Sequence, residues 1–483
     1  MPQSEMTAKV GSVSAKNQTQ SPVNPAGINA NEAKKPAGKS KIFTWPVVAW
    51  SLWDFGSAAF NAVVTTFVFS TYLTSDQMFT DSDTAQKLLS QGLTIAGIVI
   101  ALLAPITGQR ADRRGKGTFL LGLNTFAVVG CMVAMFWVHP DSALGPLGAL
   151  WLGIILMGLG NIFFEFASVN YNAMLGRISK PENMGTISGI GWGSGYFGGI
   201  LLLGLLLVGF LGDGAHWFGV PNDNHLPIRA SILFSALWFG ACALPVLFTI
   251  RGRKYESSEA GADDGHETII DSYRFLGRTI KSLFKEAPQT LLFLAASAIF
   301  RDGLAGVFMY GAIIGRSVFG FDQGQIMIFA ILANVVAGIA TWAFGWIEDR
   351  IGPKKVIIIS LVSMITCGFI VFFAHNGGQI IFWTVGLVLT AFVGPAQSAS
   401  RAFLGRMIPE GREGEVFGLY ATTGRAVSFL APAMYFVSLQ VGEALTGLEK
   451  GYDYWGILGI VLILFLGLLI LIPVKPERAH LNH

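Results

Sequence analysis

Long apolar stretches recur along almost the whole sequence, and each has the length of a helix that crosses a membrane. Such a helix needs about 20 consecutive apolar residues to cross roughly 30 Å of hydrocarbon. Hydrophobic residues make up 52% of the chain and charged residues only 13%, whereas soluble domains carry roughly 25% charged residues. The sequence therefore predicts an all-α membrane protein with twelve transmembrane helices. We place them near residues 47–73, 88–107, 118–138, 147–172, 186–210, 229–250, 289–314, 324–345, 356–374, 378–400, 415–440 and 453–473.

The polar segments between these stretches predict how the chain is oriented and divided. Most of the 33 lysines and arginines lie in the N-terminal segment and in the loops near 110–116, 251–285, 350–355 and 401–412. Because basic residues accumulate in cytoplasmic loops, both termini are predicted to be cytoplasmic. We expect a disordered cytoplasmic tail at 1–41, an N-terminal six-helix bundle at 42–250, a cytoplasmic linker at 251–287, a C-terminal six-helix bundle at 288–474 and a cytoplasmic tail at 475–483.

The second part of the linker has the pattern of an amphipathic helix. Apolar residues from Ile269 to Leu283 recur at helical spacing, and Arg274, Arg278 and Lys281 lie on the other side. This pattern is typical of a helix that lies on the membrane surface with its basic face toward anionic headgroups. A simple linker helix is the alternative.

One charged loop occurs twice, as G-x-x-x-D-R-x-G followed by basic residues. The first copy occupies residues 108–116 and the second residues 345–355, about half the chain length apart. The segments AMLGR at 173–177 and AFLGR at 402–406 repeat in the same order. The sequence therefore predicts two parallel repeats, which are typical of transporters whose halves rock around a central site.

The repeated loop resembles the loop between the second and third helices of the major facilitator superfamily. Three further segments resemble one branch of it, which includes the vacuolar amino-acid effluxers of fungi and many uncharacterised bacterial permeases. They are Trp50–Phe60, Arg301–Gly303 and Ser400–Tyr420, and the resemblance covers roughly residues 45–475. It implies the major facilitator fold, with two pseudo-symmetric six-helix bundles, and transport of amino acids.

Five charged residues are predicted to lie inside transmembrane helices: Asp54, Glu165, Arg301, Asp302 and Arg425. A charge at that depth costs about 2.5–3.5 kcal/mol on insertion scales, so each one needs a partner or a function. Arg301 and Arg425 fall about a dozen residues into their helices, near the bilayer midplane at roughly 1.5 Å per residue. There an arginine can hold a substrate carboxylate through two parallel hydrogen bonds. Alternatively, both arginines are permanently paired with Asp302, Asp54 or Glu165 and only hold helices together.

The carboxylates Asp54 and Glu165 are candidates for proton coupling. A carboxyl group in a partly dehydrated cavity can exchange a proton near neutral pH, which links its charge to the conformation. Alternatively, Asp54 reaches interfacial water or a neighbouring backbone group. Neutral hydrogen bonds would come from nearby amide side chains. The predicted substrate-binding or proton-coupling residues are Asp54, Asn61, Glu165, Arg301, Asp302, Gln397 and Arg425.

The repeated loop also predicts a mechanical role. Asp112 is expected beside the start of the eleventh helix, where a carboxylate accepts hydrogen bonds from exposed amides and meets the positive dipole end. Arg177 would steady Asp112, and Asp349 with Arg406 would make the same contact with the fifth helix. Such contacts would hold the cytoplasmic side closed in an outward-open state; alternatively, the basic residues only enforce topology and bind lipid headgroups. The predicted gating residues are Gly108, Asp112, Arg113, Gly115, Arg177, Asp349, Arg350, Gly352 and Arg406.

Other patterns argue against several kinds of partner. The Gly193–Gly198 segment fits a dinucleotide-binding glycine pattern, but it lies inside an apolar stretch, where small residues let helices approach closely. The sequence has no G-x-x-x-x-G-K-[ST] loop, its three cysteines lie far apart, and its net charge is only +3. We therefore expect no enzymatic activity, no cofactor, no metal site and no nucleic-acid partner.

These features together predict a secondary active transporter that works by alternating access, is coupled to protons and carries amino acids or similar small solutes, with efflux as a candidate direction. Its partners would be a small-molecule substrate, protons and the lipid bilayer, and we expect a monomer. The alternatives are an exporter of a drug-like or sugar-like solute, and a transport-dead membrane sensor or scaffold. The charged loops retained in both halves argue against a scaffold, and so do the unpaired charges that we expect at both midplane positions, Arg301 and Arg425. We expect a multi-pass integral membrane protein of the bacterial cytoplasmic membrane, or of the vacuolar membrane in a eukaryote.

Overall fold

The computed structural model describes most of the chain after the N-terminal segment. The predicted tail at 1–41, most of the predicted linker at 251–287 and all but the first residue of the predicted tail at 475–483 lie outside the described residues. The amphipathic linker helix therefore stays a prediction. The described residues are 42–75, 78–212, 217–221, 223–250, 274, 277–278, 280–281, 283–285, 287–408, 412–447 and 451–475.

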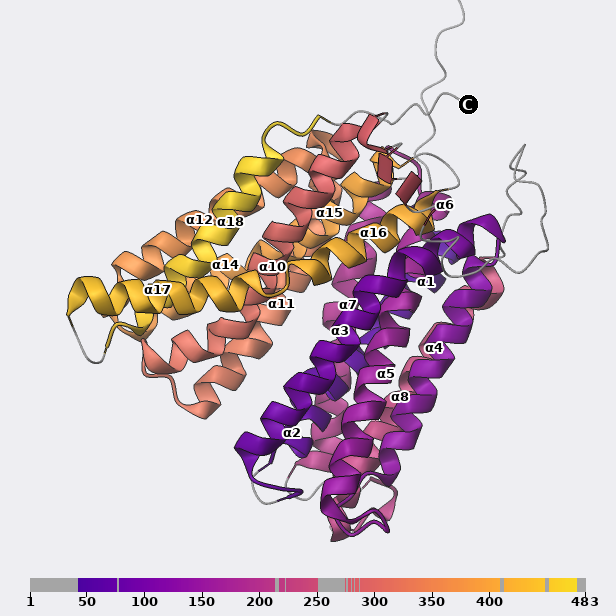
Figure 1. The fold of residues 1–483 in the computed structure, drawn as a ribbon, viewed down its shortest axis with the longest axis vertical. Coiled ribbons are helices and arrows are strands. Elements are labelled where there is room, and N and C mark those ends of the chain that lie inside the picture. The colour runs from indigo at the N-terminus through magenta and orange to yellow at the C-terminus, as the bar shows by residue number, and fades with distance from the viewer. Residues whose placement is uncertain are drawn as a thin grey trace, which may run out of the picture. The chain divides into compact units, whose positions relative to one another are not determined.

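All regular secondary structure in the described residues is helical (Figure 1). The first group of helices comprises α1 (Trp45–Ala58), the π-helix η1 (Ala59–Phe67), α2 (Phe69–Leu73), α3 (Ser82–Arg113), α4 (Gly117–Ala134), η2 (Met135–Trp137), α5 (Gly145–Ala173), α6 (Leu175–Ile178), α7 (Met184–Leu206), the π-helix η3 (Leu207–Leu211), η4 (Trp217–Gly219), η5 (Asp223–His225) and α8 (Leu226–Thr249). The second group comprises α10 (Pro288–Ser317), α11 (Gln323–Ile351), α12 (Pro353–Phe373), η6 (His375–Gly377), α13 (Gln379–Ile381), the π-helix η7 (Phe382–Gly386), α14 (Leu387–Ala391), α15 (Val393–Met407), α16 (Glu413–Ala426), α17 (Leu430–Thr446), η8 (Asp453–Trp455) and α18 (Gly456–Leu471).

Eleven helical segments in the described part of the chain are long and apolar enough to cross a membrane. They cover eleven of the twelve predicted apolar stretches, so the all-α membrane fold is confirmed. Polar residues mark where some of them begin. The carboxylate of Asp81 accepts a hydrogen bond from the amide of Thr84 at 2.8 Å at the start of α3. The hydrogen bonds from the amide and the hydroxyl of Thr84 hold the pKa of Asp81 below its ordinary value.

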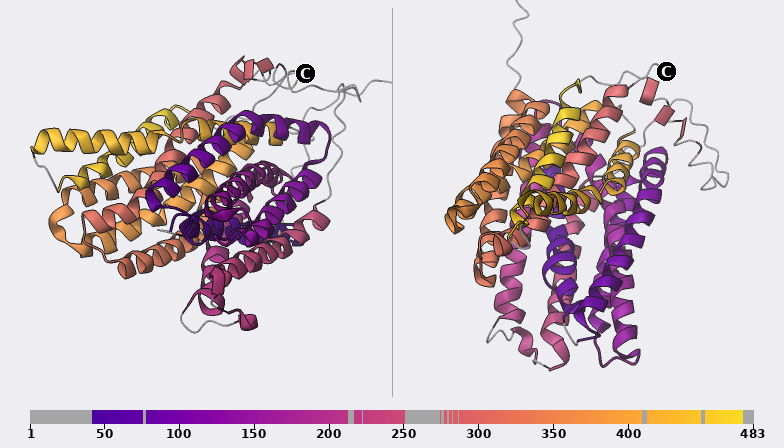
Figure 2. Two further views of the ribbon diagram at one scale, coloured as in Figure 1. Left: turned by 60° about the horizontal axis from the view of Figure 1, so that its bottom comes forward. Right: turned by 60° about the vertical axis from the view of Figure 1, so that its left-hand side comes forward.

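The stretch predicted as one helix at 415–440 is divided into α16 and α17. Residues 427–429 form the turn between them. Pro432 favours the division, because in a continuous helix its ring would clash with the carbonyl four residues earlier. Asp302 of α10 completes the new helix start, since its carboxylate accepts a hydrogen bond from the amide of Ala431 at 2.7 Å. In Figure 1 and the right-hand view of Figure 2, α17 lies at an angle to α10 and α18.

Most buried apolar side chains belong to two clusters. One is built mainly from the first group of helices, between Val47 and Ile250, and the other mainly from the second group, between Leu283 and Val474. The exceptions are Ala402 of α15, which belongs to the first cluster, and five first-group residues that belong to the second: Ile100, Ala104, Phe166, Val169 and Ala173. Figure 1 draws the first group in indigo to magenta and the second in red to yellow. The bounds of the two predicted bundles stay predictions.

Glycines lie where α7 contacts α11 and where α16 contacts α3. A Cβ atom added at Gly189 of α7 would lie 2.8 Å from the carbonyl oxygen of Thr341, and one at Gly418 of α16 would lie 2.7 Å from that of Ala104. The absence of a side chain lets these backbones approach. The Gly193–Gly198 segment lies within α7 as well, so it is a helix rather than a phosphate-binding loop. Both contacts lie toward the repeated loops, and we call this side of the protein the loop side.

Candidate functional site

Asp349, near the loop-side end of α11, contacts the beginning of α7. Its carboxylate accepts hydrogen bonds from the amides of Gly185 and Thr186, at 2.8 and 2.9 Å, and from the Thr186 hydroxyl at 2.5 Å. Arg406 of α15 donates to Asp349 at 3.0 Å and to the buried Glu348 at 2.5 Å. The carboxylate thus lies where a helix start exposes amides and the positive dipole end. The contact expected of Asp349 and Arg406 with the fifth membrane helix is present; its gating role stays a proposal.

Asp112, the counterpart in the first repeat, contacts the beginning of α16. Its carboxylate accepts a hydrogen bond from the amide of Glu415 at 2.9 Å. The Glu415 side chain is itself paired with Arg412 at 3.0 Å. Arg177 lies within electrostatic range of Asp112, but within the described residues no hydrogen bond or ion pair joins them. Arg177 therefore acts on Asp112 through electrostatic attraction, whereas Arg406 donates directly to Asp349; the steadying role predicted for Arg177 stays a proposal.

Among the remaining loop residues, Gly115 and Gly352 shape the turns, whereas Gly108 lies at the contact between the two groups. Gly115 and Gly352 have positive φ angles of 60° and 91°, which residues with side chains adopt at a cost. Gly108 packs against the backbone of α16, and the guanidinium of Arg350 lies 3.6 Å from the ring centroid of Trp346. The side chain of Arg113 lies outside the described part of the structure.

Arg401 is the most deeply placed cation among the described residues. The sequence pattern counts it with the basic residues of the loop at 401–412, but the structure places it inside α15 with an exposed fraction of 2%. Its Nε donates to the hydroxyl of Ser188 at 3.0 Å and its Nη2 to the Ser188 carbonyl at 2.7 Å. Its Nη1 donates to the amide oxygen of Asn172 at 3.2 Å and lies 3.7 Å from a carboxylate oxygen of Asp54. Arg401 thus reaches from the second group of helices into the first.

Aromatic rings complete the surroundings of Arg401. Its guanidinium lies 4.8, 5.1 and 5.7 Å from the ring centroids of Trp50, Trp192 and Tyr171. The hydroxyl of Tyr171 donates to Asp54 at 3.2 Å, and its ring stacks on Trp50 with centroids 4.4 Å apart. Cation–π contacts of this kind gain strength when the cation is desolvated. The cation is therefore enclosed by one carboxylate, neutral oxygen atoms and three aromatic side chains.

Sequence reasoning missed Arg401 as a functional residue, and it missed its partners other than Asp54. The repeat held a usable signal, because the match of 173–177 with 402–406 pairs Arg401 with Asn172, which was expected inside a helix. By the same match, the tenth membrane helix, predicted to end at position 400, includes Arg401. The contacts with Ser188 and Trp192 carry no sequence signal, since they come from another helix.

A second ion pair joins the two groups through Arg425 of α16. Its Nη2 lies 3.1 Å from a carboxylate oxygen of Glu165 in α5 and 3.4 Å from the amide oxygen of Asn161. The Arg425 and Glu165 side chains are 34% and 19% exposed, so water reaches this pair. The expectation that both midplane arginines are unpaired is therefore wrong for Arg425. Its partner Glu165 is one of those named in the alternative that the arginines are permanently paired and only hold helices together.

Arg301 and Asp302 have separate partners in spite of their adjacency. The guanidinium of Arg301 donates to the carbonyl of Tyr420 at 3.2 Å and lies 3.8 Å from the centroid of its ring. Within the described residues, no carboxylate lies within ion-pair distance of Arg301. Asp302 is buried and accepts from the amide of Ala431, so it stabilises the start of α17. The structure thus leaves the N–H groups of Arg301 that face away from Tyr420 open to another acceptor.

The two predicted amide residues lie apart from these ion pairs. Asn61 is exposed in η1, where its carbonyl accepts from the hydroxyls of Thr65 and Thr66, both at 2.7 Å. Gln397 is half-buried in α15. Neither side chain contacts the charged residues within the part of the chain that the structure describes.

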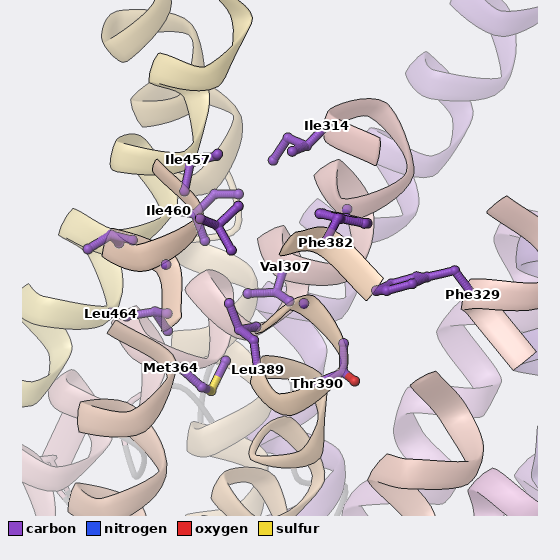
Figure 3. Close-up of a pocket in the computed structure, with 15 residues that line it drawn as sticks. Val307, Ile314, Phe329, Met364, Phe382, Leu389, Thr390, Ile457, Ile460 and Leu464 are labelled. Atoms are coloured by element: carbon purple, nitrogen blue, oxygen red, sulfur yellow. The ribbon is translucent and has the colours of Figure 1, made fainter. Parts of the chain in front are cut away.

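A cavity of about 70 Å³ lies inside the second group of helices (Figure 3). The single polar side chain in its lining is Thr390, whose hydroxyl donates to the carbonyl of Leu387 at 2.8 Å. A charged solute there would be desolvated without a partner. None of the predicted site residues lines it, so we do not assign substrate binding to it. Its labelled lining residues are Val307, Ile314, Phe329, Met364, Phe382, Leu389, Thr390, Ile457, Ile460 and Leu464.

Comparison with known proteins identifies the family. Residues 82–479 match the family model described as vacuole effluxer Atg22 like. The chain belongs to this family. It is 25% identical over 447 residues to the uncharacterized MFS-type transporter YxiO of Bacillus subtilis, covering 91% of this chain and 97% of that protein. It is 24% identical over 309 residues to autophagy-related protein 22-1 of Aspergillus niger, covering 60% of this chain and 47% of that protein. The match thus spans about half the length of the fungal relative.

Solved structures confirm the major facilitator fold. The proton:xylose symporter XylE bound to a bromodeoxyglucose matches with a TM-score of 0.68 at 14% identity, covering 90% of this chain and 97% of that one. A bacterial homologue of the iron transporter ferroportin in its outward-facing state matches with a TM-score of 0.62 at 17% identity, covering 89% and 98%. This Atg22-like protein is therefore a multi-pass membrane transport protein of the major facilitator superfamily, in agreement with the resemblance found in its sequence.

Proposed function

We propose that this Atg22-like protein is a secondary active transporter that works by alternating access, couples transport to protons and carries amino acids or similar small zwitterions. One observation supports this proposal most directly. On the loop side, Asp112 and Asp349 each join one group of helices to the first turn of a helix in the other group. Contacts made of a few hydrogen bonds can form and break as the two groups rock.

The two ion pairs supply a route to proton coupling. Asp54 and Glu165 come from the first group of helices, and their partners Arg401 and Arg425 come from the second. If the two groups separate on the loop side, the Asp54 carboxylate loses its nearby cation. A carboxylate without a cation in a partly dehydrated site takes up a proton more readily. By linkage, proton binding then favours the state that is open on the loop side.

Arg301 is the better candidate to hold a substrate carboxylate. Arg425 already lies against Glu165, whereas the described neighbours of Arg301 are a carbonyl oxygen and a ring face. A guanidinium has five N–H donors, so Arg301 keeps donors for a bidentate contact with a carboxylate. This contact, together with an acidic partner for the amine, would suit a zwitterion.

Transport in vesicles tests the proposal. The full chain is purified and reconstituted, and uptake and efflux of a radiolabelled amino-acid panel are measured with and without a proton gradient. We expect at least one amino acid to be transported and its flux to follow the gradient. Transport of a sugar or a drug-like compound in place of amino acids would reassign the substrate. Transport of none of these compounds, by a chain that elutes as one folded species, would favour the scaffold alternative.

A further inference from the structure

Arg401 occupies a pocket that the other group of helices builds. Every partner described above for its guanidinium belongs to α1, α5 or α7, while Arg401 itself extends from α15. The adjacent Ala402 is also buried in the apolar cluster of the first group. We call these surroundings the cation pocket, and they consist of Trp50, Asp54, Tyr171, Asn172, Ser188 and Trp192.

The chemistry of the cation pocket suits any small organic cation. Its oxygen atoms come from one carboxylate, one amide side chain, one hydroxyl and one backbone carbonyl. A primary ammonium or a guanidinium offers three to five N–H donors that match such acceptors. The indole and phenol rings add the face contacts that bound organic cations use. No lysine, arginine or histidine among the described residues other than Arg401 contributes to the pocket.

Arg401 fills the pocket in the arrangement described here, in which α15 packs against α7. Arg401 sits on α15, which joins α7 through Ser188 and Ser398; the Ser188 hydroxyl donates to the Ser398 carbonyl at 2.9 Å. If the two groups separate on the loop side, α15 moves away from α7 and Arg401 is withdrawn from the pocket. The carboxylate and the rings then remain without their cation.

We propose that the cation pocket binds the ammonium or guanidinium group of the transported solute, and that Arg401 takes its place whenever the loop side is closed. This inference rests on the proposed transport function and narrows its substrate class to solutes that carry an organic cation. The solute cation and Arg401 exclude each other. Loading therefore occurs from the loop side, and return of Arg401 drives the cation out of the pocket.

Binding of two simple probes, radiolabelled guanidine and radiolabelled methylammonium, tests the inference on the purified full chain in lipid nanodiscs. Gly189→Leu holds the loop side open, because an added Cβ would already lie 2.8 Å from the carbonyl oxygen of Thr341. We expect it to bind a probe roughly tenfold more tightly than the parent protein. Gly418→Leu, at the contact of α16 with α3, should raise the affinity for the probe in the same way. Gly130→Leu is the matched control, since a Cβ there meets nothing within 4 Å.

Pocket variants identify where the probe binds. Asp54→Asn in the Gly189→Leu background should lower probe affinity roughly tenfold or more, and Arg401→Ala in the parent background should raise guanidine binding. Glu443→Gln, which changes an exposed carboxylate on α17, should leave the affinity for both probes unchanged. Thermal melting confirms that each variant is folded.

The two proposals fail separately. Equal probe binding in the parent protein and both glycine variants, or no effect of Asp54→Asn, would overturn the cation pocket even if amino acids are transported in vesicles. Probe binding that follows the pattern above supports the pocket, even where the vesicle assay shows that the transported solute is not an amino acid.

Discussion

Asp349 and Asp112 differ in how many hydrogen bonds they accept across the two groups of helices. Asp349 accepts three from α7 and is paired with Arg406, whereas Asp112 accepts from the amide of Glu415 at 2.9 Å and from that of Gly414. Asparagine keeps the shape but removes the charge that these donors meet. We expect Asp349→Asn to shift the equilibrium toward the loop-side-open state by about 2 kcal/mol, and Asp112→Asn by about 1 kcal/mol.

A cysteine at Ser398 reports this shift, because that position is buried between α7 and α15 on the loop side. Its labelling by a membrane-impermeant maleimide, added from the loop side, should be fastest in Asp349→Asn. Unchanged labelling in both variants would contradict the gating role of the repeated loops and favour the alternative that their basic residues only bind lipid headgroups.

Arginine-to-lysine substitutions distinguish the roles of the two midplane arginines, Arg301 and Arg425, in substrate binding. Lysine keeps the charge but lacks the planar fork that a carboxylate engages with two bonds. We expect Arg301→Lys to weaken binding of a carboxylated substrate about tenfold, with little effect on its neutral amide analogue. Arg425→Lys should affect binding less, since Arg425 is paired with Glu165. Binding measured on the purified protein checks both; equal behaviour of the two variants would remove the argument for a carboxylate at Arg301.

At the scale of elements, the start of α17 depends on one buried side chain. Asp302 accepts from the amide of Ala431 beside the turn that divides α16 from α17. Removal of a capping acceptor costs about 1–2 kcal/mol and leaves a buried amide unpaired. We expect Asp302→Ala to lower the melting temperature clearly, and Asp302→Asn, which keeps an acceptor oxygen, to lower it less. Equal melting of both variants and the parent would mean that the cap contributes nothing.

The elements themselves were largely predictable, because an apolar run of about 20 residues is a local property of the sequence. The division at 427–429 was not predicted, although Pro432 gives a local reason for it. The contacts of Asp112 and Asp349 with helix starts were expected because the loop that holds them is repeated. The burial of Arg401 was not, since its partners come from three other helices and no spacing within one helix records them.

For the whole molecule, the glycine contacts set how closely the two groups can approach on the loop side. Gly189→Leu and Gly418→Leu each place a side chain where backbone atoms now lie. We expect both to slow net transport and to raise loop-side labelling of the cysteine at Ser398, while Gly130→Leu changes neither. Normal transport by both variants would show that closure does not require these contacts.

The ion pairs between the groups have a fixed polarity: the first group supplies the carboxylates of Asp54 and Glu165, and the second supplies Arg401 and Arg425. Like halves therefore cannot satisfy one another, because two copies of the first would oppose carboxylate to carboxylate. If the chain is cut within 251–285 and both fragments are produced together, they should assemble as unlike pairs. The direction of the charges thus favours association of a first half with a second half over association of two like halves.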